Sequence, residues 1–180
     1  VEVPGNAALN VRWGISLGQL GEWEQALAHF EEAVSADSLY SEAYLHWGIA
    51  LERLERWEAA IGKLERAAEL EIDKGPVLFY LASSYEQAAR HLDRMDFFDR
   101  AVETFERLLE FNPNDSYALN YLGYMYAVKG IRLEVAVDLL MRAISLEPEN
   151  SAFLDSLGCA YCRLGQLQHD STSQQNVYWS

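Results

Sequence analysis

The sequence predicts an all-α solenoid, in which a pair of antiparallel helices is repeated along the chain. Three observations carry this prediction. Small residues recur in one register, as Gly14, Gly48, Ala82, Gly123 and Gly158, and a second set recurs as Ala26, Ala60, Ala101 and Ala136. Apolar residues flank both sets at helical spacing. From each residue of the second set to the next residue of the first set the step is 22 residues: 26 to 48, 60 to 82, 101 to 123 and 136 to 158. Such self-similarity is typical of a single array of stacked repeats.

Composition limits the classes of function. Half of the 180 residues are hydrophobic, which is enough for a core and makes disorder an unsuitable description. The 28 acidic residues outnumber the 14 basic ones, and the net charge of -14 works against binding to nucleic acid or anionic lipid. No apolar run is long enough to predict membrane insertion. We expect a soluble chain, with the cytoplasm favoured as its compartment.

The first two repeats have equal length. Residues 1–6 contain Pro4, Gly5 and Asn6 and are expected to be a lead-in. Repeat one covers about 7–40 and repeat two about 41–74, because both small-residue anchors recur after 34 residues: 14 to 48 and 26 to 60. Each repeat is expected to hold two amphipathic helices.

Two later repeats carry insertions. The third covers about 75–115, and its two anchors, Ala82 and Ala101, lie seven residues further apart than in the first two repeats. Seven residues make almost two helical turns, so each helix of this repeat is expected to be longer by about one turn. Asp96 is the expected N-cap of the second. The fourth repeat covers about 116–150 and has one extra residue near Gly130.

The chain ends in a half repeat, residues 151–165, followed by a tail, residues 166–180. Leu154, Leu157, Tyr161 and Leu164 belong to a first helix whose second helix is missing from the pattern. Solenoids usually end in a polar face, and this face is apolar. Two alternatives are open: the tail folds back over the helix, with Ser171 and Gln174 as a capping box, or another chain covers it.

The pattern resembles the tetratricopeptide repeat family over residues 7–165. In the fourth repeat Leu119, Leu122, Gly123 and Tyr126 are followed by Ala136, and Pro148 closes the repeat. The 34-residue step is that of the family. The chain departs from the motif in two ways, since position four is never Trp and the closing Pro occurs only as Pro113 and Pro148. The resemblance implies that the solenoid is right-handed and that the first helices line a concave groove.

The groove positions implied by the resemblance are aliphatic in the first half and rich in Tyr in the second, with Glu42, Glu52 and Glu86 among the charges. They are Val11, Ile15, Leu45, Ile49, Phe79, Tyr80, Ser83, Tyr117, Asn120, Tyr121, Tyr124 and Asp155. Exposed aromatic and apolar groups usually mark interaction surfaces. The alternative is that these side chains only fill the inner side of the superhelix. The family's clamp for a C-terminal carboxylate is not expected, because apolar residues such as Val11 and Leu45 occupy its positions.

The expected function is a noncatalytic scaffold that binds a peptide or helix in the groove, with basic or aromatic residues in the partner. An alternative is self-assembly, as a homodimer or larger, through the apolar half repeat or the groove. A remote alternative is thiol redox or zinc chemistry at Cys159 and Cys162, for which His169 is the nearest further ligand. No catalytic set, metal site or cofactor is predicted.

Overall fold

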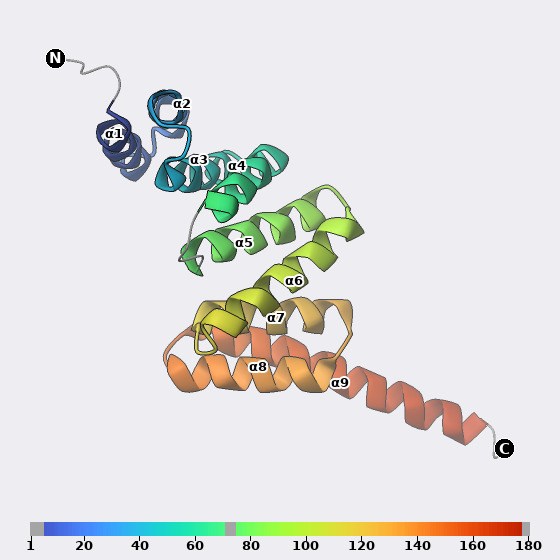
Figure 1. Ribbon diagram of the computed structural model, residues 1–180. Helices are drawn as coiled ribbons and strands as arrows, with labels where there is room; N and C mark the ends of the chain where they lie inside the picture. The colour runs from blue at the N-terminus through green and yellow to red at the C-terminus, as the bar shows by residue number, and fades with distance from the viewer. Residues whose placement is uncertain (1–5, 71–74, 178–180) are drawn as a thin grey trace. The chain divides into compact units, whose positions relative to one another are not determined.

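The computed structural model describes residues 6–70 and 75–177, with side chains described for 6–70 and 75–166. In these ranges the chain forms nine helices and no strand (Figure 1). Their bounds are α1 Ala7–Gln19, α2 Trp23–Ala36, α3 Ser41–Arg53, α4 Trp57–Leu70, α5 Gly75–His91, α6 Met95–Phe111, α7 Ser116–Lys129, α8 Leu133–Leu146 and α9 Ser151–Val177. The predicted all-α fold of successive helix pairs is confirmed.

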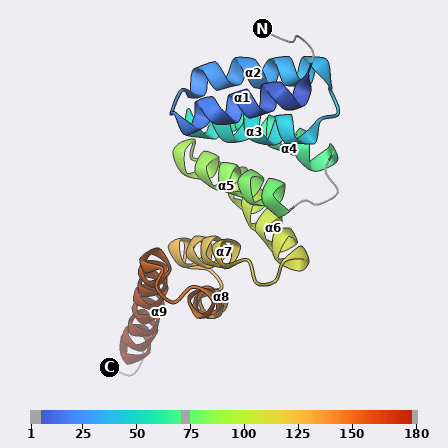
Figure 2. The ribbon, with the colours of Figure 1, turned by 90° about the vertical axis from the view of Figure 1, so that its left-hand side faces the viewer.

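The helices form two compact units, Val1–Thr104 and Phe105–Ser180. In the first unit α1 packs on α2, α3 on α4, and each second helix also contacts the first helix that follows it. Figure 2 shows α1 and α2 side by side. The first helices α1, α3 and α5 contact one another in sequence. In the second unit α7 packs on α8, and α9 contacts both. First helices therefore stack on first helices within each unit, as a groove along them requires.

Close packing inside the first two helix pairs depends on glycine. An ideal Cβ on Gly14 would lie 2.5 Å from a ring atom of Phe30, and one on Gly48 would lie 2.5 Å from Leu64 Cγ. Phe30 and Leu64 are buried, so they have little room to move. The anchor alanines of the second helices are fully buried: Ala26, Ala60, Ala101 and Ala136. Residue size at these positions thus determines how near the two helix axes lie.

The turns inside the repeats all have the same length, residues 20–22, 54–56, 92–94 and 130–132. In the first three the middle residue has a positive φ: 81° for Gly21, 57° for Glu55 and 52° for Asp93. The fourth turn instead has positive φ at Gly130 and at Arg132. Because this loop is no longer than the others, the extra residue of the fourth repeat lies in α7, which has 14 residues against 13 in α1 and α3.

The third repeat is longer in both of its helices. α5 and α6 have 17 residues each, against 13 or 14 for α1 to α4, which confirms the expected extra turn in each. The prediction that Asp96 caps α6 is wrong, because α6 begins at Met95 and Asp96 lies inside the first turn. There its carboxylate accepts two hydrogen bonds of 2.7 Å from the Arg94 guanidinium, which lowers the pKa of Asp96.

Helix α9 continues past the half repeat. It runs from Ser151 to Val177, so the backbone stays helical through most of the segment assigned to a tail. A new helix starting near Ser171, one of the two alternatives for covering α9, is not present in the structure. Within the described residues, no helix is both long enough and apolar enough to cross a membrane.

Candidate functional site

In the first unit, most of the predicted groove residues lie half-buried on the first helices. Ile15, Leu45, Ile49, Phe79 and Tyr80 keep part of their side chains open to solvent. The rings of Phe79 and Tyr80 meet edge to face with their centroids 5.6 Å apart. This surface is apolar and includes both aliphatic and aromatic side chains.

Val11 and Ser83 differ from the other predicted groove residues of the first unit. Val11 is buried among the core residues at 1% exposure, so it is not available to a partner in this structure. Ser83 is also buried, at 4%, and its hydroxyl donates a hydrogen bond to Glu52. Val11 is therefore a core residue, whereas Ser83 hydrogen-bonds and positions the carboxylate of Glu52. The resemblance gave positions on a helix face but not how deep each side chain lies.

In the second unit, the predicted groove residues are mainly polar aromatics. Tyr117 is 49% exposed and meets Phe153 of α9 edge to face at 5.5 Å. Tyr121 is half-buried and stacks on Phe105 at 5.5 Å. Half-buried Asn120 and Tyr124 share α7 with them, and Asp155 is exposed on α9. The Asn120 amide oxygen is buried and accepts no hydrogen bond within the described residues.

A charged cluster connects α3 and α5 in the first unit. The carboxylate of Glu52 accepts hydrogen bonds from the hydroxyls of Ser83, at 3.2 Å, and Ser84, at 3.0 Å. Burial nevertheless raises the pKa of Glu52, and the nearby charge of Glu86 adds to the rise. Two hydroxyls therefore only partly compensate for the water that this carboxylate has lost.

Glu86 adds a second, more deeply buried carboxylate. Its side chain is 9% exposed, and Oε1 accepts from Nε and Nη2 of Arg90 at 3.1 and 2.5 Å. Its other oxygen, Oε2, is buried without a hydrogen-bond partner in the described part of the chain. A buried carboxylate oxygen without a donor is unfavourable, so this group favours an additional donor. The sequence placed Glu52 and Glu86 among the groove charges, but it did not predict their burial or the contribution of Ser84.

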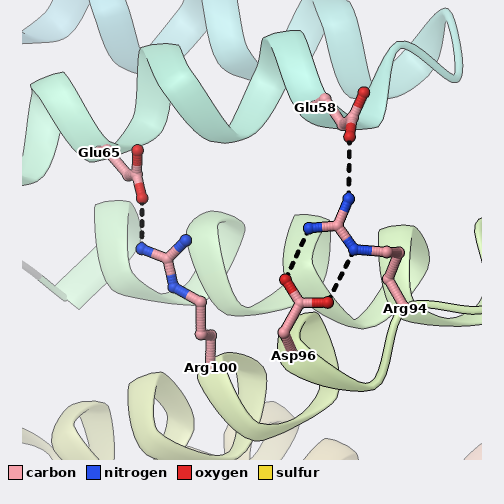
Figure 3. A network of polar contacts seen from close by, with 5 residues as sticks. All are labelled: Glu58, Glu65, Arg94, Asp96 and Arg100. Atoms are coloured by element: carbon pink, nitrogen blue, oxygen red, sulfur yellow. Dashed lines mark hydrogen bonds and ion pairs between the residues drawn. The ribbon is translucent and has the colours of Figure 1, made fainter.

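Elsewhere in the first unit, arginines join the second helices α4 and α6. Arg100 of α6 reaches Glu65 of α4 at 2.6 Å, and Arg94 reaches Glu58 at 3.5 Å while holding Asp96 (Figure 3). Tyr85 also donates to Glu65 at 2.6 Å, and the Arg100 guanidinium lies 4.5 Å from the centre of the Tyr85 ring. These contacts join neighbouring repeats and point to a structural role.

The second unit repeats this arrangement. Tyr126 donates to Glu106 at 2.8 Å, while Arg132 reaches the same carboxylate at 3.1 Å and faces the Tyr126 ring at 5.4 Å. In both units the carboxylate comes 20 residues before the tyrosine. Both tyrosines are buried, at 2% exposure each, and the sequence gave no partner for their hydroxyls.

The remaining predicted residues lie on α9. Leu154 and Tyr161 are each 50% exposed, and Leu157 and Leu164 are half-buried. Cys159 and Cys162 are both free thiols, half-buried and exposed respectively. No group of three residues able to hold a metal ion occurs among the side chains that the structure describes, which do not include His169.

The comparisons with known proteins agree with this geometry. The family model described as tetratricopeptide repeat matches residues 11–76 and 85–151. No curated protein matches the chain. A crystal structure of MamA is similar at 25% identity and a TM-score of 0.71, covering 83% of this chain and 82% of that one.

Two more distant solved structures show the same fold. A crystal structure of MamA protein has 19% identity and a TM-score of 0.76, covering 94% of this chain and 88% of that one. A structure of MamA from residue 41 to its end, from Desulfovibrio magneticus RS-1, has 18% identity and a TM-score of 0.71. It covers 93% of this chain and 96% of that one.

Proposed function

Because the chain belongs to the tetratricopeptide repeat family, we propose that it is a noncatalytic scaffold whose first helices bind a segment of a partner protein. The segment carries apolar residues together with Arg or Lys. The observation that carries this proposal is the pair of carboxylates on the first helices of the first unit, half-buried Glu52 on α3 and buried Glu86 on α5.

The surroundings of the two carboxylates favour a cationic partner. The guanidinium of Arg90 reaches Oε1 of Glu86, and the charge of Arg53 lowers the pKa of Glu52 without offsetting the effect of burial. Oε2 of Glu86 has no donor, and the two serine hydroxyls leave the pKa of Glu52 raised. A guanidinium or ammonium from a partner would supply N–H donors to these carboxylates, together with a positive charge that stabilises the ionised form of Glu52. An acidic segment would meet repulsion here and from the net charge of -14.

The apolar side chains supply the second part of recognition. Leu45, Ile49 and Phe79 lie half-buried on the same first helices as the two carboxylates, so each has area left to lose on binding. Apolar burial contributes about 25 cal/mol per Å² before the costs of association are subtracted. An alternation of basic and apolar residues therefore suits this surface better than either kind alone.

The second unit offers a different set of contacts. Its exposed and half-buried tyrosines, Tyr117 and Tyr124, are large and rigid, which makes them good contact residues. The unpartnered amide oxygen of Asn120 is suited to accept a backbone N–H from a bound segment. We expect this unit to contact aromatic or extended parts of a partner.

Labelled peptides test the proposal by fluorescence anisotropy. One 12-residue peptide alternates Arg with Leu and Phe, a second replaces every Arg by Glu, and a third replaces every Leu and Phe by Ser. The chain should bind the first peptide with micromolar or better affinity, and both replacements should weaken binding at least tenfold. Equal binding of the Arg and Glu peptides would overturn the proposal, as would the absence of binding to all three.

Self-assembly through α9 is the second candidate, favoured by the exposure of Leu154 and Tyr161. Light scattering across a range of concentrations tests it. A molar mass that stays near 20.5 kDa would remove this candidate. A larger mass that Leu157→Glu lowers would support it, because the new charge lies among the exposed apolar residues of α9.

A further inference from the structure

One glycine in the array lacks the contact that the equivalent glycines have. In α1, α3 and α7 a Cβ added to the anchor glycine would meet a large side chain of the paired second helix. The distance is 2.5 Å from Gly14 to Phe30, 2.5 Å from Gly48 to Leu64 and 2.7 Å from Gly123 to Leu140. Gly158 holds the same register in α9, and a Cβ there would meet no atom within 4 Å. The space that a large side chain fills in three other repeats is open in α9.

The opposite side of α9, in its described part, packs against the array. Phe153 and Ala160 are buried, at 1% and 0% exposure, where α9 contacts α7 and α8. Leu154 and Tyr161, which lie four residues before and three after Gly158, are each half exposed. One side of α9 therefore continues the array, and within the described residues no second helix packs on the side that carries Gly158.

The three filled positions define what fits this space. In each, the side chain that meets the glycine comes four residues after a fully buried alanine: Ala26 before Phe30, Ala60 before Leu64 and Ala136 before Leu140. The carbonyl oxygen of Ala136 would lie only 3.1 Å from a Cβ on Gly123, so a small residue is needed where the backbones approach. The pattern is Ala followed four residues later by Phe or Leu, on the apolar side of a helix.

We propose that α9 binds an amphipathic helix of this pattern from a partner protein, with its Phe or Leu placed against Gly158. The interface would continue the one that joins α7 to α8, with Leu154 and Tyr161 packing beside the inserted side chain. A second copy of the chain is a poor source, because its helices α2, α4 and α8 are already paired with their own first helices. This site is separate from the Glu52 and Glu86 cluster and does not depend on peptide binding there.

The probe is a labelled peptide of residues 132–147, which contains Ala136 and Leu140 and is stapled through its exposed positions 134 and 138. The staple is needed because isolated helices of this length are marginal in water. The control peptide carries Leu140→Ala. Binding to the full chain is followed by fluorescence anisotropy, and the Leu140→Ala peptide should bind at least tenfold more weakly.

Two glycine variants make a matched pair. Gly158→Leu fills the open space, whereas Gly62→Leu puts the same side chain on α4 at another exposed helical glycine with no atom within 4 Å. Gly158→Leu should weaken binding of the probe at least tenfold without lowering the melting temperature, and Gly62→Leu should leave binding unchanged. Glu52→Gln should also leave it unchanged, which separates this site from the groove.

Four outcomes would overturn the inference. Three concern the probe: equal binding to wild type and Gly158→Leu, equal binding of the two peptides, and loss of binding in Glu52→Gln. The fourth concerns the oligomeric state. A dimer in light scattering that Gly158→Leu converts to monomer would show that a second copy, and not a partner helix, occupies the face.

Discussion

Gly48 and Gly62 are both helical, yet they should respond to alanine in opposite ways. A Cβ on Gly48 would lie 2.5 Å from Cγ of fully buried Leu64, so Gly48→Ala should lower the free energy of unfolding by about 1–3 kcal/mol. Gly62 is exposed and has no atom within 4 Å, so Gly62→Ala should raise it by about 1 kcal/mol, because glycine costs conformational entropy in a helix.

Chemical denaturation of both variants checks this prediction. A Gly48→Ala chain as stable as wild type would show that α3 and α4 can separate at little cost, which would contradict the packing described here. The Gly62→Ala variant is the control for helix propensity, since it introduces alanine into a helix without a steric contact like that between residue 48 and Leu64.

The sequence predicted well where helix packing requires a small residue, and it predicted poorly which side chains are buried or in contact. Gly48 and Ala60 were correctly assigned to helix packing, because a small residue repeated in one register has a direct steric meaning. The burial of Val11 and Glu86 was not predicted, because it depends on how far neighbouring helices extend over each position. Asp96 was misplaced because helix α6 starts one residue before it, and its carboxylate pairs with the guanidinium of Arg94.

Pairs of helices are held together by contacts that recur between elements. Tyr85 bridges α5 to Glu65 of α4, and Tyr126 bridges α7 to Glu106 of α6. Tyr85→Phe and Tyr126→Phe should each lower the free energy of unfolding by roughly 1–2 kcal/mol at neutral pH, since each removes a hydrogen bond to a charged group. Urea denaturation of the two single variants measures the cost in each unit.

The pH dependence of the Tyr85 contact has a definite sign. Burial, and then the hydrogen bond to Glu65, raise the pKa of Tyr85 above its ordinary value of 10.0. The folded chain therefore holds this proton more tightly than the unfolded chain. The contribution is complete below the unfolded pKa and is lost as the pH rises towards the folded one. Wild type should lose stability above pH 10 more steeply than Tyr85→Phe, and parallel curves would contradict the assignment.

At the level of elements, the repeat boundaries were predictable and the end of the array was not. The spacing between Ala82 and Ala101 predicted the extra turn in α5 and in α6. Because the turns inside the repeats have constant length, the inserted residues have to lie in the helices. Helix α9 extends to Val177 although its repeat pattern stops earlier. The anchor pattern reports packing between two helices, so it carries no information where a second helix is missing.

For the molecule as a whole, family membership determines the repeat fold, whereas the proposed binding preference depends on residues particular to this chain. The all-α repeat fold could be predicted from the sequence, because each repeat has small residues at the same positions, where paired helices approach each other. The sequence also led us to expect basic residues in a partner, but it did not predict where we propose that they bind, because that place depends on the buried Oε2 of Glu86 and on the partial burial of Glu52. The net charge of -14 acts in the same direction over longer distances.

The most direct test of this account compares two charge-neutralising variants by titration calorimetry with the Arg, Leu and Phe peptide. Glu52→Gln removes one carboxylate of the cluster, whereas Glu69→Gln removes one on α4 that pairs with Arg66 at the surface. If the peptide binds at the Glu52 and Glu86 cluster, Glu52→Gln should weaken its affinity about tenfold, which is the free energy of about one hydrogen bond to a charged group. Glu69→Gln should leave the affinity unchanged. Equal affinities for the two variants would contradict a binding site at the first helices.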